Sequence, residues 1–329
     1  MSLPRVLIAG YATVDLVFHG FDEVPPPGST TQAEGLEISP GGHAVNVSVD
    51  MVKLGYDASS LTVYFKVGDD VFGEMVLSYL KSFGIAPAAP PVRGARTSIV
   101  AVLSPRLSDR RFVNFAGASE LFTFEELSRL AAGAEALYIT TGVWARIGQP
   151  IEGYHGLKVV DFSAVPPRLS HRVRDAVEWA DLVHGNPSEL SSAMGSASYV
   201  DAVRRLLRGG VTAVLVSKGD AGAELFVDGI AVRQRAYSVR AVDATGAGDA
   251  MVAAMLVWLM TRRLTSPRSL LRLSSDELAE ALAFAQAAGA SAVTDYGATA
   301  GVSRDLVERL INEQGDQVIK TTEFSKFEA

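Results

Sequence analysis

Short strand-like runs alternate with amphipathic segments along most of the chain. Residues 6–9, 61–65, 136–139, 157–160, 181–184 and 213–216 are rich in apolar residues and short, which is typical of buried strands. Between them, apolar side chains recur at helical spacing in residues 43–54, 71–83, 125–130, 168–179, 187–194 and 200–207. This alternation predicts an α/β fold in which helices cover both faces of a mostly parallel sheet.

Two segments interrupt the alternation. Residues 16–40 contain three consecutive prolines and a weak strand signal at 36–38, and residues 96–115 contain strand signals at 98–103 and 112–115 around a charged turn. We expect these segments to form an insertion of their own. Further along, Asp228-Gly229 predicts a hairpin between 225–227 and 231–233.

The last third of the chain is mostly helical. Periodic apolar residues predict helices at 249–261, 276–294 and 304–312. We expect one domain over residues 1–312, followed by a polar tail at 313–329 that is partly disordered.

Composition narrows the classes of function. The chain has no cysteine, which excludes disulfides, zinc fingers and thiol nucleophiles. Its net charge of −7 argues against a nucleic-acid partner, because such proteins need a basic surface. The longest apolar run, 250–260, is much shorter than the roughly 20 residues that cross a bilayer, and the N-terminus does not resemble a signal peptide. We therefore expect a cytoplasmic protein with no membrane partner.

The segment Asp243-Ala-Thr-Gly-Ala-Gly-Asp249-Ala carries the strongest chemical signal. Small residues at 246–248 let backbone N–H groups turn toward a ligand, and the apolar helix that follows directs its positive end at the same point. Together these features predict an anion hole. A lone Asp before a helix is more often a simple cap, but a capping Asp does not need Gly-Ala-Gly before it.

Two further segments fit a polar ligand. Gly41-Gly42 opens a helix and permits close approach of a ligand, and Asn46 in an early turn of that helix can hydrogen-bond a hydroxyl. Asp15 follows a glycine at a strand end, and an ionised carboxylate suits paired sugar hydroxyls. Each signal is weak alone, since Gly-Gly before a helix is usually a loop and Asp15 could be an ordinary surface residue.

The combined motifs resemble the ribokinase-like (PfkB) family of carbohydrate and nucleoside kinases. The resemblance runs from Gly10 to about Gly301 and includes, in the family's order, GYATVD at 10–15, GGHAVN at 41–46, VGDDVFG at 67–73, NPSE at 186–189, VSKGDAG at 216–222, DATGAGDA at 243–250 and AGASAVTDYGA at 288–298. It implies a three-layer ribokinase-like fold in which the segments near 16–40 and 96–115 form a small β-sheet lid.

The resemblance also implies residue roles. Asp249 would be the catalytic base, and Gly246, Ala247 and Gly248 would form the anion hole. Asp15, Gly42 and Asn46 would bind the acceptor, with Thr13 standing where ribokinase has a sugar-binding Asn. The implied nucleotide-binding residues are Asn186, Ser217, Gly219, Thr245, Gly289 and Gly297. Glu189 would bind Mg²⁺ through water, and Asp243 would bind a monovalent cation such as K⁺.

The implied activity is ATP- and Mg²⁺-dependent transfer of a phosphoryl group to a hydroxymethyl group of a sugar or nucleoside. One alternative is a kinase of an already phosphorylated sugar, for which Arg96, Arg110 and Arg111 are the candidate basic residues. Another is a non-catalytic sensor, although a sensor would not need Asp249. The lid could also provide the surface of a homodimer, because a small exposed sheet has unpaired edges.

Overall fold

The computed structural model describes residues 2–108, 110–163, 165 and 167–328. Its larger sheet has nine strands in the order β13-β12-β11-β10-β9-β8-β7-β1-β4. Six neighbouring strands are parallel: β4 (Leu61–Tyr64), β1 (Val6–Ala9), β7 (Ala136–Thr140), β8 (Leu157–Asp161), β9 (Leu182–Gly185) and β10 (Ala213–Ser217). The antiparallel strands are β11 (Ala223–Val227), β12 (Ile230–Gln234) and β13 (Glu323–Lys326). The predicted mixed α/β sheet is thereby confirmed.

The central strands carry apolar side chains on both faces of the sheet, and helices cover both faces. In β1, Val6 and Ile8 join one apolar core while Leu7 and Ala9 join the other. The first core is completed by α1 (His43–Lys53), α2 (Val71–Ser82), α8 (Ala247–Thr261), α9 (Pro267–Leu270), α10 (Ser275–Ala292), α11 (Arg304–Leu310) and α12 (Asp316–Lys320). The second is completed by α3 (Phe124–Ala131), α4 (Thr141–Ile147), α5 (Arg172–Trp179), α6 (Pro187–Met194) and α7 (Tyr199–Arg208).

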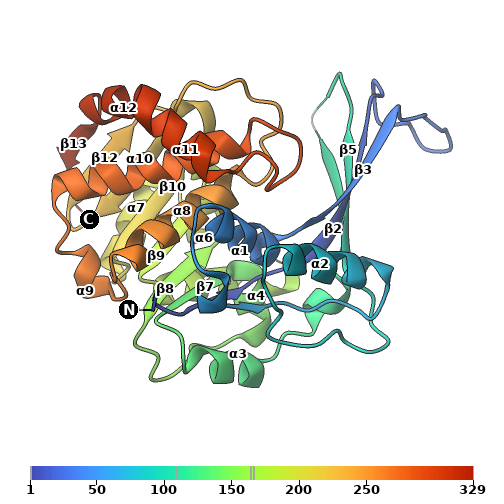
Figure 1. Cartoon of the computed structure of the whole chain (residues 1–329), viewed down its shortest axis with the longest axis horizontal. Coiled ribbons are helices and arrows are strands. Elements are labelled where there is room, and N and C mark those ends of the chain that lie inside the picture. The colour runs from blue at the N-terminus through green and yellow to red at the C-terminus, as the bar shows by residue number, and fades with distance from the viewer. Residues whose placement is uncertain (1, 109, 164, 166, 329) are drawn as a thin grey trace.

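A separate four-stranded sheet rises away from this body (Figure 1). We call it the small sheet; its order is β3 (Gly35–Gly41), β2 (Thr13–His19), β5 (Ser98–Ser104), β6 (Arg111–Phe115). The two interrupting segments therefore form an insertion, as predicted, although residue 109 in the charged turn lies outside the described residues. The strand at the start of the first segment was not predicted.

The C-terminal segment corrects the expectation of a partly disordered tail. Residues 316–320 form α12, and β13 pairs antiparallel with β12 at the edge of the large sheet. Phe327 is buried, with its ring 4.6 Å from that of Phe226. Burial of a few apolar side chains thus anchors a segment whose composition is mostly polar.

No helix among the described residues has the length and apolar character needed to span a bilayer.

Candidate active site

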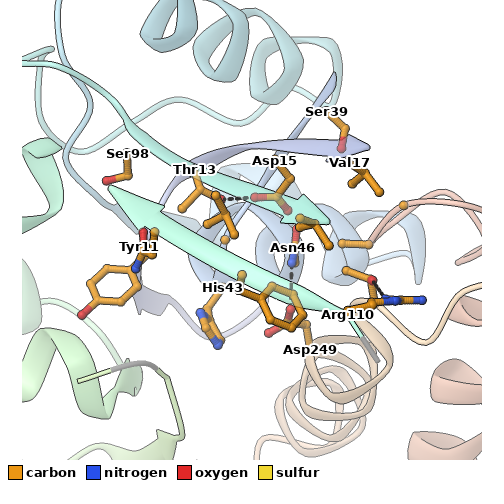
Figure 2. A pocket seen from close by; sticks show the side chains of 18 of the residues that line it. Tyr11, Thr13, Asp15, Val17, Ser39, His43, Asn46, Ser98, Arg110 and Asp249 are labelled. Carbon is orange, nitrogen blue, oxygen red and sulfur yellow. Dashed lines mark hydrogen bonds between the residues drawn. The ribbon is translucent and has the colours of Figure 1, made fainter. Parts of the chain in front are cut away.

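A cavity of about 540 Å³ lies between the small sheet and the body, where the parallel strands end. The predicted acceptor residues line it together with Asp249 and part of the loop before α8 (Figure 2). The sequence-predicted residues in its lining are Thr13, Asp15, Gly42, Asn46, Arg110, Asp243, Thr245, Asp249 and Gly297.

Asp249 lies in the first turn of α8, three residues after the helix N-cap Gly246. It is not the N-cap, so the simplest structural interpretation of this residue is wrong. Its carboxylate accepts a hydrogen bond of 2.8 Å from the side-chain amide of Asn46, on α1. Burial raises the pKa of Asp249 above its ordinary value; His43 opposes the rise and the charge of Asp161 adds to it. A carboxylate with a raised pKa is a better proton acceptor.

The loop before Asp249 requires glycine. Gly246 has φ +79°, and a Cβ at this position would stand 2.1 Å from the carbonyl oxygen of Ala298. The N–H groups of Gly248 and Asp249 donate no hydrogen bond to any described residue. These free N–H groups begin a helix of 15 residues, so the predicted anion hole has the required donors and dipole.

The end of the cavity that holds the predicted acceptor residues is built from β2, β3 and α1. The Thr13 hydroxyl donates to Asp15 at 2.9 Å. Burial raises the pKa of Asp15 to about 6, with Thr13 lowering it and the charge of Asp249 raising it further. In the described part of the chain, Asn46 Oδ1 and His43 Nδ1 are buried without a hydrogen-bond partner. Unsatisfied polar atoms that face a cavity are available to the hydroxyl groups of a ligand.

Asp243 is already surrounded by donors. Its carboxylate accepts hydrogen bonds from the N–H and hydroxyl of Thr245, from the N–H of Gly297 and from Arg110 at 3.1 Å. Burial alone would raise the pKa of Asp243, but these hydrogen bonds hold it below its ordinary value. The cation in contact with Asp243 is the Arg110 guanidinium, so a monovalent-cation role for Asp243 stays a prediction.

Four of the expected nucleotide-binding positions and the expected Mg²⁺ residue lie outside the described cavity lining. Three of these five residues make contacts that stabilise the fold, and Gly219 is surrounded by open space. Asn186 and Glu189 form a capping box at the start of α6, in which Glu189 accepts from the Asn186 N–H at 2.8 Å. Ser217 ends β10, and Gly219 follows with open space around its Cα. Gly289 is buried in α10, where a Cβ would meet Met251 of α8 at 2.7 Å. The structure thus gives Gly289 a packing role between the two helices, and its expected place beside the nucleotide stays a prediction.

Close to the predicted anion hole lies a buried pair that the sequence did not reveal. His184 Nδ1 is 2.7 Å from Asp161, which also accepts from the Tyr138 hydroxyl at 2.9 Å. Burial lowers the pKa of His184, but Asp161 outweighs this effect and raises it. The imidazole faces Gly248, whose Cβ would be 3.2 Å from His184 Cε1. The imidazole end of the pair is therefore close to the start of α8.

Two arginines line the cavity. Arg110, from the turn before β6, reaches Asp243 and Thr245, while Arg146 projects from α4. Arg110 was one of the three expected basic residues; the other two, Arg96 and Arg111, are absent from the described lining. Arg146 was missed because α4 was not predicted.

Comparison with known proteins agrees with this geometry. Residues 4–305 match the model of the pfkB family carbohydrate kinases. The chain is 31% identical to a fructokinase from Klebsiella pneumoniae over 325 residues, covering 93% of this chain and 98% of the relative. Two solved structures share the fold. One is the Arabidopsis thaliana ribokinase complexed with ribose and ATP, with a TM-score of 0.72 and 21% identity. The other is an E. coli protein in complex with ATP and Mg²⁺, with a TM-score of 0.75 and 20% identity. Each match covers 94% of this chain and 99% of the other.

Proposed function

The chain belongs to the pfkB family of carbohydrate kinases, and from this premise we propose that it transfers the γ-phosphoryl group of ATP to a hydroxymethyl group of a sugar or nucleoside, with Asp249 as general base. The observation that carries the proposal is one arrangement in α8. A carboxylate with a raised pKa lies at the edge of the cavity, in the same helical turn as free N–H groups that can receive a phosphoryl group.

In this mechanism Asp15 and Asn46 hold the hydroxyl groups of the acceptor. Asp249 takes the proton of the attacking hydroxyl as its oxygen approaches the γ-phosphorus. The N–H groups at the start of α8 stabilise the negative charge on the transferring group. Phosphoryl transfer of this kind depends on positioning and charge stabilisation and needs no covalent enzyme intermediate.

The direct test is an ADP-release assay over a panel of hexoses, pentoses, nucleosides and sugar phosphates. The proposal expects ADP release that depends on one acceptor and a phosphorylated product at its hydroxymethyl group. ATP and sugar binding without any turnover would instead support the non-catalytic sensor.

The first prediction concerns pH. Asp15 must be ionised to accept hydrogen bonds from two sugar hydroxyls, and its pKa is raised to about 6. We therefore expect kcat/KM for the acceptor to fall as the pH drops below 6, because protonation removes the charged form. The Asp15→Asn variant should raise KM and lose this part of the profile, which steady-state kinetics between pH 5 and 8 will measure.

The Asp15 assignment would be contradicted by an unchanged acid limb in Asp15→Asn. In that outcome the titrating group would be Asp249, whose raised pKa also predicts loss of activity at low pH.

For Mg²⁺, the described residues contain no group of three or more metal-ligating side chains. In the proposed site the ion is held mainly by phosphate oxygens and water, as Mg²⁺ commonly is. One Glu189 oxygen caps the Asn186 N–H, while the other makes no hydrogen bond to a described residue. Glu189 can therefore organise the water shell, and Mg²⁺ supplies charge neutralisation of the phosphates when it is bound with ATP.

The second prediction follows from that arrangement. Glu189→Gln keeps the cap, since glutamine also serves in a capping box, but it removes the negative charge. We expect the Mg²⁺ concentration that gives half-maximal activity to rise roughly 10-fold with little change in melting temperature. Titration of Mg²⁺ at fixed ATP measures this shift, and identical titration curves for the variant and the wild type would remove Glu189 from the metal site.

The small sheet is the proposed lid. Arg110 at its tip already contacts Asp243 and Thr245 in the loop before α8. The face of the sheet away from the cavity also exposes apolar side chains that suit a homodimer surface: Leu36, Ile38, Val113 and Phe115 are 47–63% exposed. We propose that acceptor binding closes the sheet, which carries Asp15 on β2, over Asn46 and Asp249, and that this closure excludes water from the reaction.

Hydrogen exchange gives the third prediction. With the true acceptor bound, amides in residues 33–39 and 98–115 should gain more protection than those in helix α11. Repeating the experiment without acceptor at two protein concentrations distinguishes dimerisation from lid closure, because only the protection caused by a dimer rises with protein concentration. Equal protection of the small sheet and α11 in the free and bound protein would argue for a static sheet.

A further inference from the structure

Arg146 is a buried cation at the acceptor end of the cavity. It projects from α4, its side chain is only 8% exposed, and it lines the same cavity as Asp249. A buried charge is costly unless an opposite charge or strong hydrogen bonds compensate it.

The protein compensates Arg146 only in part. Its Nη1 donates to the Tyr11 hydroxyl and, at 2.9 Å, to the Gly142 carbonyl oxygen, and its guanidinium lies 5.2 Å from the centre of the Tyr11 ring. These partners hold the side chain in place but are uncharged. The Nε and Nη2 groups donate no hydrogen bond to a described residue.

The nearest carboxylate does not neutralise this charge. Among the described residues only Glu120 comes within 4 Å, with an oxygen 3.9 Å from Arg146 Nη2. Glu120 is 46% exposed and lies closer, at 3.0 Å, to Arg168. A solvated carboxylate shared with a second arginine contributes little to a buried cation.

Tyr11 and His43 line the same cavity as Arg146 and Asp249. The Tyr11 ring, which contacts Arg146, lies 6.4 Å from the His43 ring, and His43 is near enough to Asp249 to lower its pKa. Figure 2 shows Tyr11 and His43 on the same side of the cavity, with His43 between Tyr11 and Asp249 in this view. A ligand with one end at Asp249 can therefore direct its other end toward Arg146.

We propose that the acceptor carries an anionic oxygen group, a carboxylate or a phosphate, at the end away from the phosphorylated hydroxymethyl group, and that Arg146 binds this group. The inference rests on the proposed kinase function and names its acceptor class. Arginine suits such a group because its remaining N–H groups can donate two parallel hydrogen bonds to adjacent oxygens.

Two matched pairs of acceptors test the charge. D-Fructose 1-phosphate differs from D-fructose by a phosphate group. D-Gluconate differs from D-glucitol by a carboxylate in place of a hydroxymethyl group. We expect the charged member of one pair to exceed its neutral partner roughly 30-fold or more in kcat/KM, and the pair that responds identifies the source of the anion. Equal or greater use of the neutral members in both pairs overturns the proposal.

Variants then assign the effect to Arg146. Arg146→Gln should remove the preference by raising KM for the charged acceptor, and Arg146→Lys should keep part of it because the charge remains. Glu120→Gln is the matched control: it removes the only nearby carboxylate, so the preference should persist or increase. An equal loss for charged and neutral acceptors in Arg146→Gln would mean that the residue is structural, and the proposal fails.

Binding without turnover separates this inference from the kinase function. Melting temperatures with each of the four compounds, in the absence of ATP, should rise only with the charged ligand and only when Arg146 is present. If that shift occurs but no compound supports ADP release, the anion site stands and the kinase proposal fails. If ADP release is seen with neutral acceptors alone, the kinase proposal stands and the anion site fails.

Discussion

Replacing Asp249 by Asn is expected to lower turnover by about 10²- to 10⁴-fold, the usual contribution of a general base. The amide can still accept the hydrogen bond from Asn46, so the link between α1 and α8 is preserved. What is lost is the ability to take a proton, and nucleotide binding should change far less than kcat. Steady-state kinetics together with calorimetric titration of ATP measure the two effects separately.

Asp15→Asn provides the matched comparison, because it also removes one carboxylate from the cavity. The two variants should differ in kind: the loss at Asp15 appears mainly in KM for the acceptor, and the loss at Asp249 mainly in kcat. Near-normal turnover in Asp249→Asn would show that another group accepts the proton, and the proposed mechanism would have to be abandoned.

The strands of the large sheet could be predicted because they are buried on both faces. Val6–Ala9 and Ala136–Thr140 are fully buried, so each is a short run without a charged residue. The strand Thr13–His19 gives no such signal, because most of its residues are only partly buried and Asp15 interrupts the apolar pattern. Helix α4 was missed for the opposite reason: most of its seven residues are buried, so it lacks the polar face that marks an amphipathic helix.

Candidate residues could be identified singly, but not the contacts among them. Asn46 and Asp249 are 203 residues apart, and only the packing of α1 on α8 brings them together. Asp161 and His184 meet because β8 and β9 are paired in parallel, in a register that places these two residues side by side. Register depends on the helix between the strands, which sequence spacing does not define.

Motif resemblance was least informative at the nucleotide end. Asn186 and Glu189 satisfy the first turn of α6, and Gly289 permits the close approach of α10 to α8. Such residues fit both a structural and a ligand-binding role, since a helix cap or a close helix contact accounts for them as well as a ligand does. The charge-specific Glu189→Gln variant separates the two roles, whereas a change to Ala would alter both.

The anion hole gives the second large expected effect. In Gly246→Ala the new Cβ would stand 2.1 Å from the Ala298 carbonyl oxygen, a distance at which the backbone must move. The residue would also have to keep φ +79°, which costs roughly 1–2 kcal/mol for a residue with a side chain. Because Gly246 is the N-cap of α8, this movement displaces the N–H groups that bind the phosphoryl group in the proposed mechanism. We expect kcat to fall by roughly 10²-fold or more, the usual effect of losing one such donor.

Gly210→Ala separates this effect from simple backbone strain. Gly210 also has positive φ, +103°, but no atom lies within 4 Å of its Cβ position, and it is not part of the cavity lining. Both variants should lower the melting temperature, whereas only Gly246→Ala should lower kcat strongly at a temperature where each remains folded. Comparable activities in the two variants would mean that the start of α8 tolerates displacement, and catalysis would then not depend on an anion hole at Gly246.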